Sequence, residues 1–126
     1  MKRGIIIFVA MVLVMMTGTI TSQAKVTKLQ ERNVQRFVFD IEDDYEYEEE
    51  LKEIIDLDVT YSEMGYGIYD VKLQMTVDKD VYEYHVIYDG VEDDDIADYG
   101  IYKGERVDSD RLEEIMIAEH PILADY

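Results

Sequence analysis

Two runs of β-prone residues between positions 66 and 88 carry the clearest alternation of apolar and polar positions in the chain. In the first run, one face of an extended chain holds Tyr69, Val71, Leu73, Met75 and Val77. In the second run, one face holds Tyr82, Tyr84, Val86 and Tyr88. Because a period of two is typical of a half-buried strand, these runs predict an antiparallel hairpin with one apolar face to cover.

The register of this hairpin follows from keeping its apolar residues on one side of the sheet. Pairing Val77 with Tyr82 and Met75 with Tyr84 meets that condition. The connection is then a loop of two residues or, over 78–81, of four. Since no glycine stands there to supply a positive φ, the sequence favours the four-residue loop around a type I turn.

A shorter alternating segment at 57–62 predicts a strand before the hairpin. The Gly-Tyr-Gly sequence at 65–67 marks the turn between them, because glycine adopts positive φ without steric cost. Matching Val59 to Val71 places this strand beside the hairpin in a meander. Residues 96–102 are a possible fourth strand at the edge, and the sequence leaves open whether it forms.

Helical spacing appears in the N-terminal half. The segment 25–39 favours a helix over a short strand, because the apolar spacing i, i+3, i+4 and i+7 forms one stripe, which consists of Val34, Phe37, Val38 and Ile41. An acidic break is expected at 40–44. A second helix is predicted from about Asp44 to Ile55, where an apolar stripe is formed by Tyr47, Leu51, Ile54 and Ile55.

A last, short helix is predicted with Ser109 as its N-cap and with its end near Glu119, because Pro121 disfavours helical geometry in the preceding residue. The predicted fold class is α+β. An N-terminal helix, or helices, pack on a three- to four-stranded antiparallel meander, and a short C-terminal helix follows. This outline is broadly similar to cystatin-like and other small secreted domains that lay a helix across a curved sheet. No motif assigns the chain to a family.

The first 24 residues differ from the rest. A basic start is followed by an apolar core at 5–16, and Ser22-Gln23-Ala24 fits a signal-peptidase site. We interpret 1–24 as a cleavable secretory signal peptide and 25–126 as a single small α+β domain, secreted or associated with the cell envelope. The alternative is a membrane anchor through residues 5–20, although a spanning helix needs roughly 20 apolar residues.

Charge narrows the possible partners. The formal charge is −18, and removing Lys2 and Arg3 with the signal leaves −20. Such a charge argues against nucleic acid and anionic lipid and leaves a basic protein or peptide, cationic wall components and metal ions as possible partners. Contact with a membrane is expected only if the signal segment is not cleaved. The chain contains no cysteine, which excludes disulfides and suits export from a bacterium.

The sequence predicts no enzyme. It has no cysteine nucleophile and no Gly-x-Ser-x-Gly turn. His85 and His120 are both interpreted as surface histidines. Enzymatic activity would require a concave pocket that holds His85 or a carboxylate with a raised pKa.

A loop at 89–98 is rich in acids, and the candidate metal ligands in it are Asp89, Asp93, Asp94, Asp95 and Asp98. Their spacing does not match the EF-hand loop. We therefore expect a solvated, self-repelling loop and no cofactor. The alternative is a calcium-responsive envelope protein, which predicts thermal stabilisation by calcium that disappears when Asp93, Asp94 and Asp95 become Asn.

The eleven tyrosines are an excess for a chain of this length. Those on the apolar faces are expected in the core, whereas Tyr66, Tyr99 and Tyr102 are candidate partner-binding residues, because aromatic rings are enriched in interfaces. The sequence thus predicts an exported, acidic, non-enzymatic domain that binds another macromolecule, as an inhibitor, an immunity factor or an accessory protein.

Overall fold

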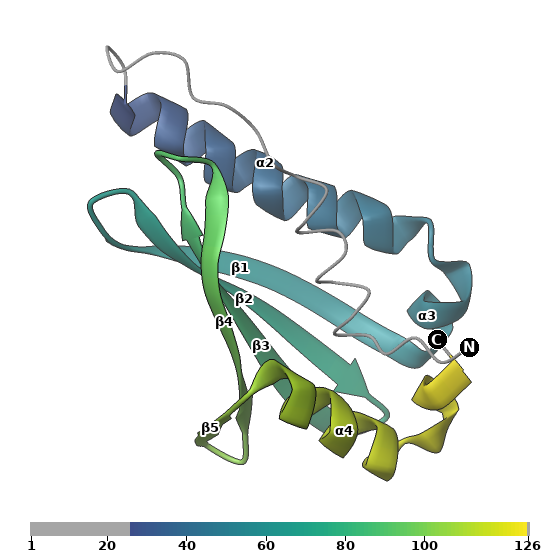
Figure 1. Cartoon of the computed structure of the whole chain (residues 1–126). Coiled ribbons are helices and arrows are strands. Elements are labelled where there is room, and N and C mark those ends of the chain that lie inside the picture. Colours follow the sequence, from purple (N-terminus) through teal and green to yellow (C-terminus); the bar gives the residue numbers. More distant parts are fainter. Residues whose placement is uncertain (1–25, 126) are drawn as a thin grey trace.

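The computed structural model describes residues 26–125, which form helices and a five-stranded antiparallel sheet (Figure 1). The elements in chain order are α2 (Val26–Glu46), α3 (Glu49–Ile54), β1 (Ile55–Gly65), β2 (Ile68–Val77), β3 (Asp80–Asp89), β4 (Asp94–Tyr102), β5 (Glu105–Val107), α4 (Ser109–Glu119) and the 3-10 helix η1 (Pro121–Asp125). The predicted signal segment 1–24 lies outside the described residues. Over 26–125, no helix has the length and apolar character needed to cross a bilayer.

The central hairpin forms with the predicted faces but in a different register. Val77 pairs with Asp80 and Met75 with Tyr82, so the predicted pairing was wrong by two residues. The connection is the two-residue turn Asp78-Lys79, in which Asp78 adopts φ 56°. Aspartate tolerates this left-handed conformation, and a positive φ at the first turn position matches the twist of the strands. The four-residue loop was therefore also wrong.

The meander is longer than the sequence suggested. β1 pairs Val59 with Leu73 rather than with Val71, again a shift of two that leaves every side chain on its predicted face. The possible fourth strand is present as β4, and a short fifth strand, β5, follows it through the turn Lys103-Gly104. The strands lie in the sheet in the order of the chain.

The N-terminal segment is one continuous helix, which confirms helix over strand for 26–39 and shows that the break expected at 40–44 was wrong. Acidic side chains do not by themselves stop a helix, and the buried stripe continues from Ile41 to Tyr45. The chain turns only at Tyr47-Glu48, and α3 is therefore shorter than predicted, since Ile55 already belongs to β1. α4 ends at Glu119 as expected.

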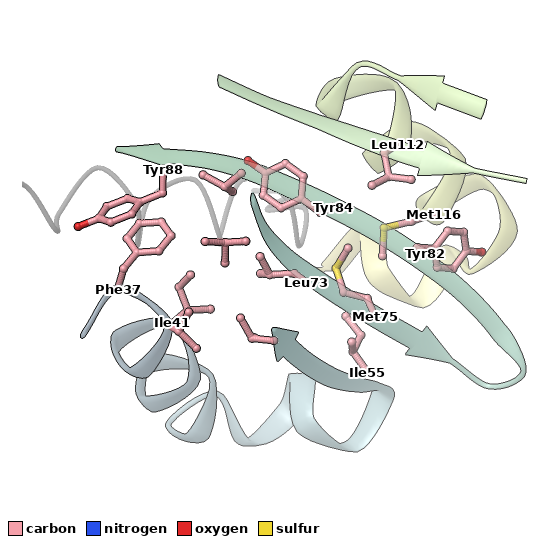
Figure 2. Packing of buried hydrophobic residues seen from close by; sticks show 14 of the residues in the cluster. Phe37, Ile41, Ile55, Leu73, Met75, Tyr82, Tyr84, Tyr88, Leu112 and Met116 are labelled. Carbon is pink, nitrogen blue, oxygen red and sulfur yellow. The ribbon is translucent and has the colours of Figure 1, made fainter. Parts of the chain in front are cut away.

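Both long helices pack on the same face of the sheet and share one core (Figure 2). On the α2 side, Phe37 stacks on Tyr88 with ring centroids 4.4 Å apart. On the α4 side, Leu112 and Met116 are fully buried over β3 and β4. None of the described helices covers the opposite face of the sheet, where the strand residues between the core positions point.

Candidate functional site

The three tyrosines predicted to bind a partner lie on three different surfaces. Tyr66 is fully exposed at the tip of the β1–β2 hairpin. Tyr99 lies on the face of β4 without helices, stacked on His85 at 4.8 Å between ring centroids. Tyr102 lies on the helix-covered face, where its hydroxyl donates a hydrogen bond to Glu119. They do not form one patch.

The acids of the 89–98 loop are also separated from one another. Asp89 accepts hydrogen bonds from the backbone N–H groups of Val91 and Glu92 at 2.9 and 3.1 Å. Asp98 accepts one from the Tyr84 hydroxyl at 2.6 Å. Asp94 and Asp95 belong to β4. Within residues 26–125, no three histidine, aspartate or glutamate side chains are grouped so that they could hold a metal ion.

Asp93 departs most from the expectation of a solvated loop, because it is only 4% exposed. Its carboxylate accepts hydrogen bonds from Tyr88 and from the Arg36 guanidinium of α2. Burial, and then the bond to Asp93, raises the pKa of Tyr88. The carboxylate thus ties α2 to the turn before β4, a contact between distant segments that no local pattern could reveal.

His85 is 9% exposed, so its interpretation as a surface histidine was wrong. Its Nδ1 lies 2.8 Å from Asp70 Oδ1, and its Nε2 lies 3.0 Å from Glu83 Oε2. Only the doubly protonated imidazole donates a hydrogen bond at both nitrogens. On the other side of this ring pair, the Cζ atom of Arg106 lies 3.9 Å from the centroid of the Tyr99 ring, in a cation–π contact. Both ring nitrogens of His85 therefore have a carboxylate partner within the sheet.

An open hollow of about 510 Å³ lies between the end of the sheet and α4. It is lined by Asp98, Tyr99, Arg106, Val107, Asp108 and Arg111. His85 is not part of its lining. Asp40, a carboxyl whose pKa is raised mainly by burial, lies on α2 and does not line it either. An enzymatic site was expected to combine a concave pocket with His85 or with a carboxylate of raised pKa. The hollow holds neither His85 nor Asp40.

The elements α2, α3 and β1 meet at one end of the molecule, and we call this end, which is rich in exposed acids, the acidic end (Figure 1). It consists of exposed carboxylates, which are Glu42, Asp43, Asp44, Glu46, Glu49, Glu50, Glu53, Asp56 and Asp58. A single basic residue lies among them in the chain, Lys52, whose Nζ is 2.7 Å from Glu46 Oε2.

Two aromatic side chains stand exposed in the acidic end. Phe39 on the outer side of α2 is 61% exposed, and Tyr47 in the turn after α2 is 77% exposed. Tyr47 had been assigned to a buried stripe, and that prediction was wrong because α2 ends at Glu46. The run of acids was visible in the sequence, but the exposure of Tyr47 was not.

The chemistry of the acidic end suits a cationic macromolecule. Closely spaced exposed carboxylates create a negative potential that speeds encounter with a basic partner, and exposed aromatic rings supply the contact area that interfaces favour. No family model, curated protein or solved structure matches the chain.

Proposed function

We propose that this protein is an exported, non-enzymatic binding protein that uses its acidic end to bind a basic protein or peptide at or outside the bacterial envelope. The observation that carries the proposal is the exposure of Phe39 and Tyr47 among nine exposed carboxylates. The signal peptide predicted at 1–24 supports export. An inhibitor, an immunity factor and an accessory protein are all consistent with such a surface.

In this proposal, the charges and the aromatic side chains contribute to binding in different ways. An exposed ion pair contributes about 0–1 kcal/mol and is screened by salt, so several carboxylates give fast but weak attraction. Covering an apolar side chain contributes about 1.5–3 kcal/mol. Binding through Phe39 and Tyr47 would therefore add affinity that persists at physiological salt.

The test compares two variants that lose the same charge. In the first, four acids of the acidic end are neutralised by Asp43→Asn, Asp44→Asn, Glu49→Gln and Glu50→Gln. In the control, four exposed acids elsewhere are neutralised by Asp94→Asn, Glu105→Gln, Asp110→Asn and Asp125→Asn. Affinity for a fluorescent lysine-rich peptide carrying one tryptophan is measured by anisotropy at 0.15 M salt.

We expect the acidic-end variant to lose about tenfold in affinity, since four pairs at about 0.3–0.5 kcal/mol sum to roughly one factor of ten. The control variant should bind nearly as the unmodified protein does. Equal losses in the two variants would show that net charge alone attracts the peptide, and the acidic end would lose its role.

The calcium hypothesis stays a prediction, and a thermal melt with millimolar calcium or magnesium tests it, because a ligand of the folded state must stabilise that state. The substitutions used should be Asp94→Asn and Asp95→Asn. Replacing Asp93 as well would break its bonds to Arg36 and Tyr88 and lower stability for a different reason. A shift specific to calcium that these two substitutions remove would replace our proposal.

A further inference from the structure

The first strand of the sheet offers a long edge. β1 spans eleven residues, against a usual strand length of about 5–6, and it pairs with β2 on one side only. At its start, the Tyr45 hydroxyl donates to the carbonyl oxygen of Ile55. From Asp58 to Met64, no part of residues 26–125 other than β2 forms a backbone hydrogen bond with it.

The second half of this edge is accessible from both faces of the sheet. Residues 60–64 are all exposed, although successive side chains of a strand point to opposite faces. The helix-covered face is therefore exposed here, although the Gln35 side chain of α2 donates a hydrogen bond of 3.4 Å to the Tyr61 hydroxyl. An exposed edge of this kind is a template for another strand.

The charge of the β1 edge determines which kind of added strand can pair with it favourably. β1 contains Asp56, Asp58 and Glu63 and no basic residue. Like charges on neighbouring strands destabilise their pairing and opposite charges stabilise it, so a second copy of β1 is disfavoured and a lysine- or arginine-bearing strand is favoured. Asp56 and Asp58 also belong to the acidic end, and the edge therefore continues directly from that surface.

We propose that β1 accepts an extended basic segment of the partner as an added strand along residues 58–64. This inference rests on the proposed function and deepens it: the acidic end attracts the basic partner, and the backbone of β1 then fixes its register. Recognition by strand addition takes affinity from main-chain hydrogen bonds and specificity from alternate side chains. A partner that bears a basic residue at every second position would place those residues on one face of the sheet, either beside Asp56 and Asp58 or, on the opposite face, beside Glu63.

The probe is a nine-residue peptide that alternates lysine with valine, compared with the same peptide N-methylated at two neighbouring central residues. Adjacent amides point to opposite edges of a strand, so the methyl groups block both edges and leave the charge unchanged. Affinity for the purified protein is measured by anisotropy, and amide hydrogen exchange is measured with and without peptide. We expect methylation to weaken binding at least tenfold, and the unmodified peptide to protect amides within 58–64.

A charge exchange on the protein gives a second measurement. The variant with Asp58→Lys and Glu63→Lys should bind the lysine peptide less and a glutamate–valine peptide more. Its control carries Asp110→Lys and Asp125→Lys, which change the net charge equally at exposed positions outside the sheet. The control should keep the preference for lysine.

The outcomes separate the two proposals. If the methylated and unmethylated peptides bind equally, strand addition is overturned, while binding through the acidic end stands. If no basic peptide binds, both proposals fail. If amides of 58–64 become protected with rising protein concentration alone, a second copy occupies the edge, and a basic partner strand is ruled out.

Discussion

At the scale of single residues, tyrosine hydroxyls bonded to carboxylates recur where α2, α4 and the loops meet the sheet. Four such pairs join different elements, and the ring is buried in three of them, which are Tyr84 with Asp98, Tyr88 with Asp93, and Tyr82 with Glu119. Each of these three rings is buried while its hydroxyl reaches a carboxylate at the rim, which suits the amphipathic phenol. Part of the acidic excess of this chain therefore has a structural role, and not every acid is available to a partner.

Asp93 is the carboxylate whose loss should cost most. Asp93→Asn removes the charge that Arg36 and Tyr88 share, in a side chain that is nearly fully buried. We expect a loss of about 1–3 kcal/mol in the free energy of unfolding, measured by urea denaturation. The matched control is Asp94→Asn at the exposed neighbour, which should change stability by less than about 0.5 kcal/mol. Equal effects would mean that the bonds of Asp93 contribute nothing.

At the scale of elements, the attachment of α4 depends on one close approach to β4. A Cβ atom at Gly100 would lie 2.8 Å from both Cβ and Cδ2 of Leu112. The glycine that weakened the sequence prediction of this strand is therefore the residue that lets the helix pack on it. Glycine within a strand often marks a close approach of this kind.

Gly100→Ala should push α4 away from the sheet. Overpacking of this size costs about 1–3 kcal/mol, which denaturation would report as a lower midpoint at an unchanged slope. Ala97→Val on the same strand is the control, since Ala97 is exposed and pairs with Ile87 on the face without helices. An unchanged midpoint for Gly100→Ala would contradict the tight contact between β4 and α4.

At the scale of the whole molecule, one face of the sheet holds the core and the acidic end extends from α2 into the free edge of β1. In our two proposals, attraction of a partner and pairing with its strand would therefore occur next to each other. The tyrosines Tyr82, Tyr84 and Tyr88, in contrast, are fully buried along β3 and join the helices to the sheet. The stability of the whole fold therefore depends on these phenols staying protonated.

This dependence predicts alkaline unfolding. Burial is the main cause that raises the pKa of Tyr82, Tyr84 and Tyr88. A folded-state pKa above that of the unfolded chain means that the folded state binds these protons more tightly. Its stability is then fully present below pH of about 10 and falls as the pH rises further.

Absorbance titration of the phenolates checks this prediction. The three buried phenols should ionise only together with loss of the near-ultraviolet circular dichroism signal. Tyr66→Phe is the control, because the loss of a fully exposed hydroxyl should not move the unfolding transition. Smooth ionisation of all tyrosines before unfolding would contradict the burial of these three.

The sequence by itself determined which residues face the core and where most elements lie. Alternation placed Tyr69 and Tyr84 on one side of a sheet, and helical spacing placed Phe37 and Ile41 on one side of a helix. These patterns are local, since they follow from the two-residue period of a strand and the 3.6-residue turn of a helix. The acidic run of the candidate site is local in the same sense and was visible from composition.

Only the tertiary structure decided how those faces meet. Alternation specifies register only up to a shift of two residues, and the positive φ of Asp78 selected between the alternatives. The burial of His85 and Asp93 depends on partners from other strands and from α2. Among the described residues, the edge of β1 is likewise free because of its place in the strand order. Contacts between distant segments leave no periodic signal in the chain, and so the sequence predicted the faces while the fold determined the register, the buried acids and the exposed strand edge.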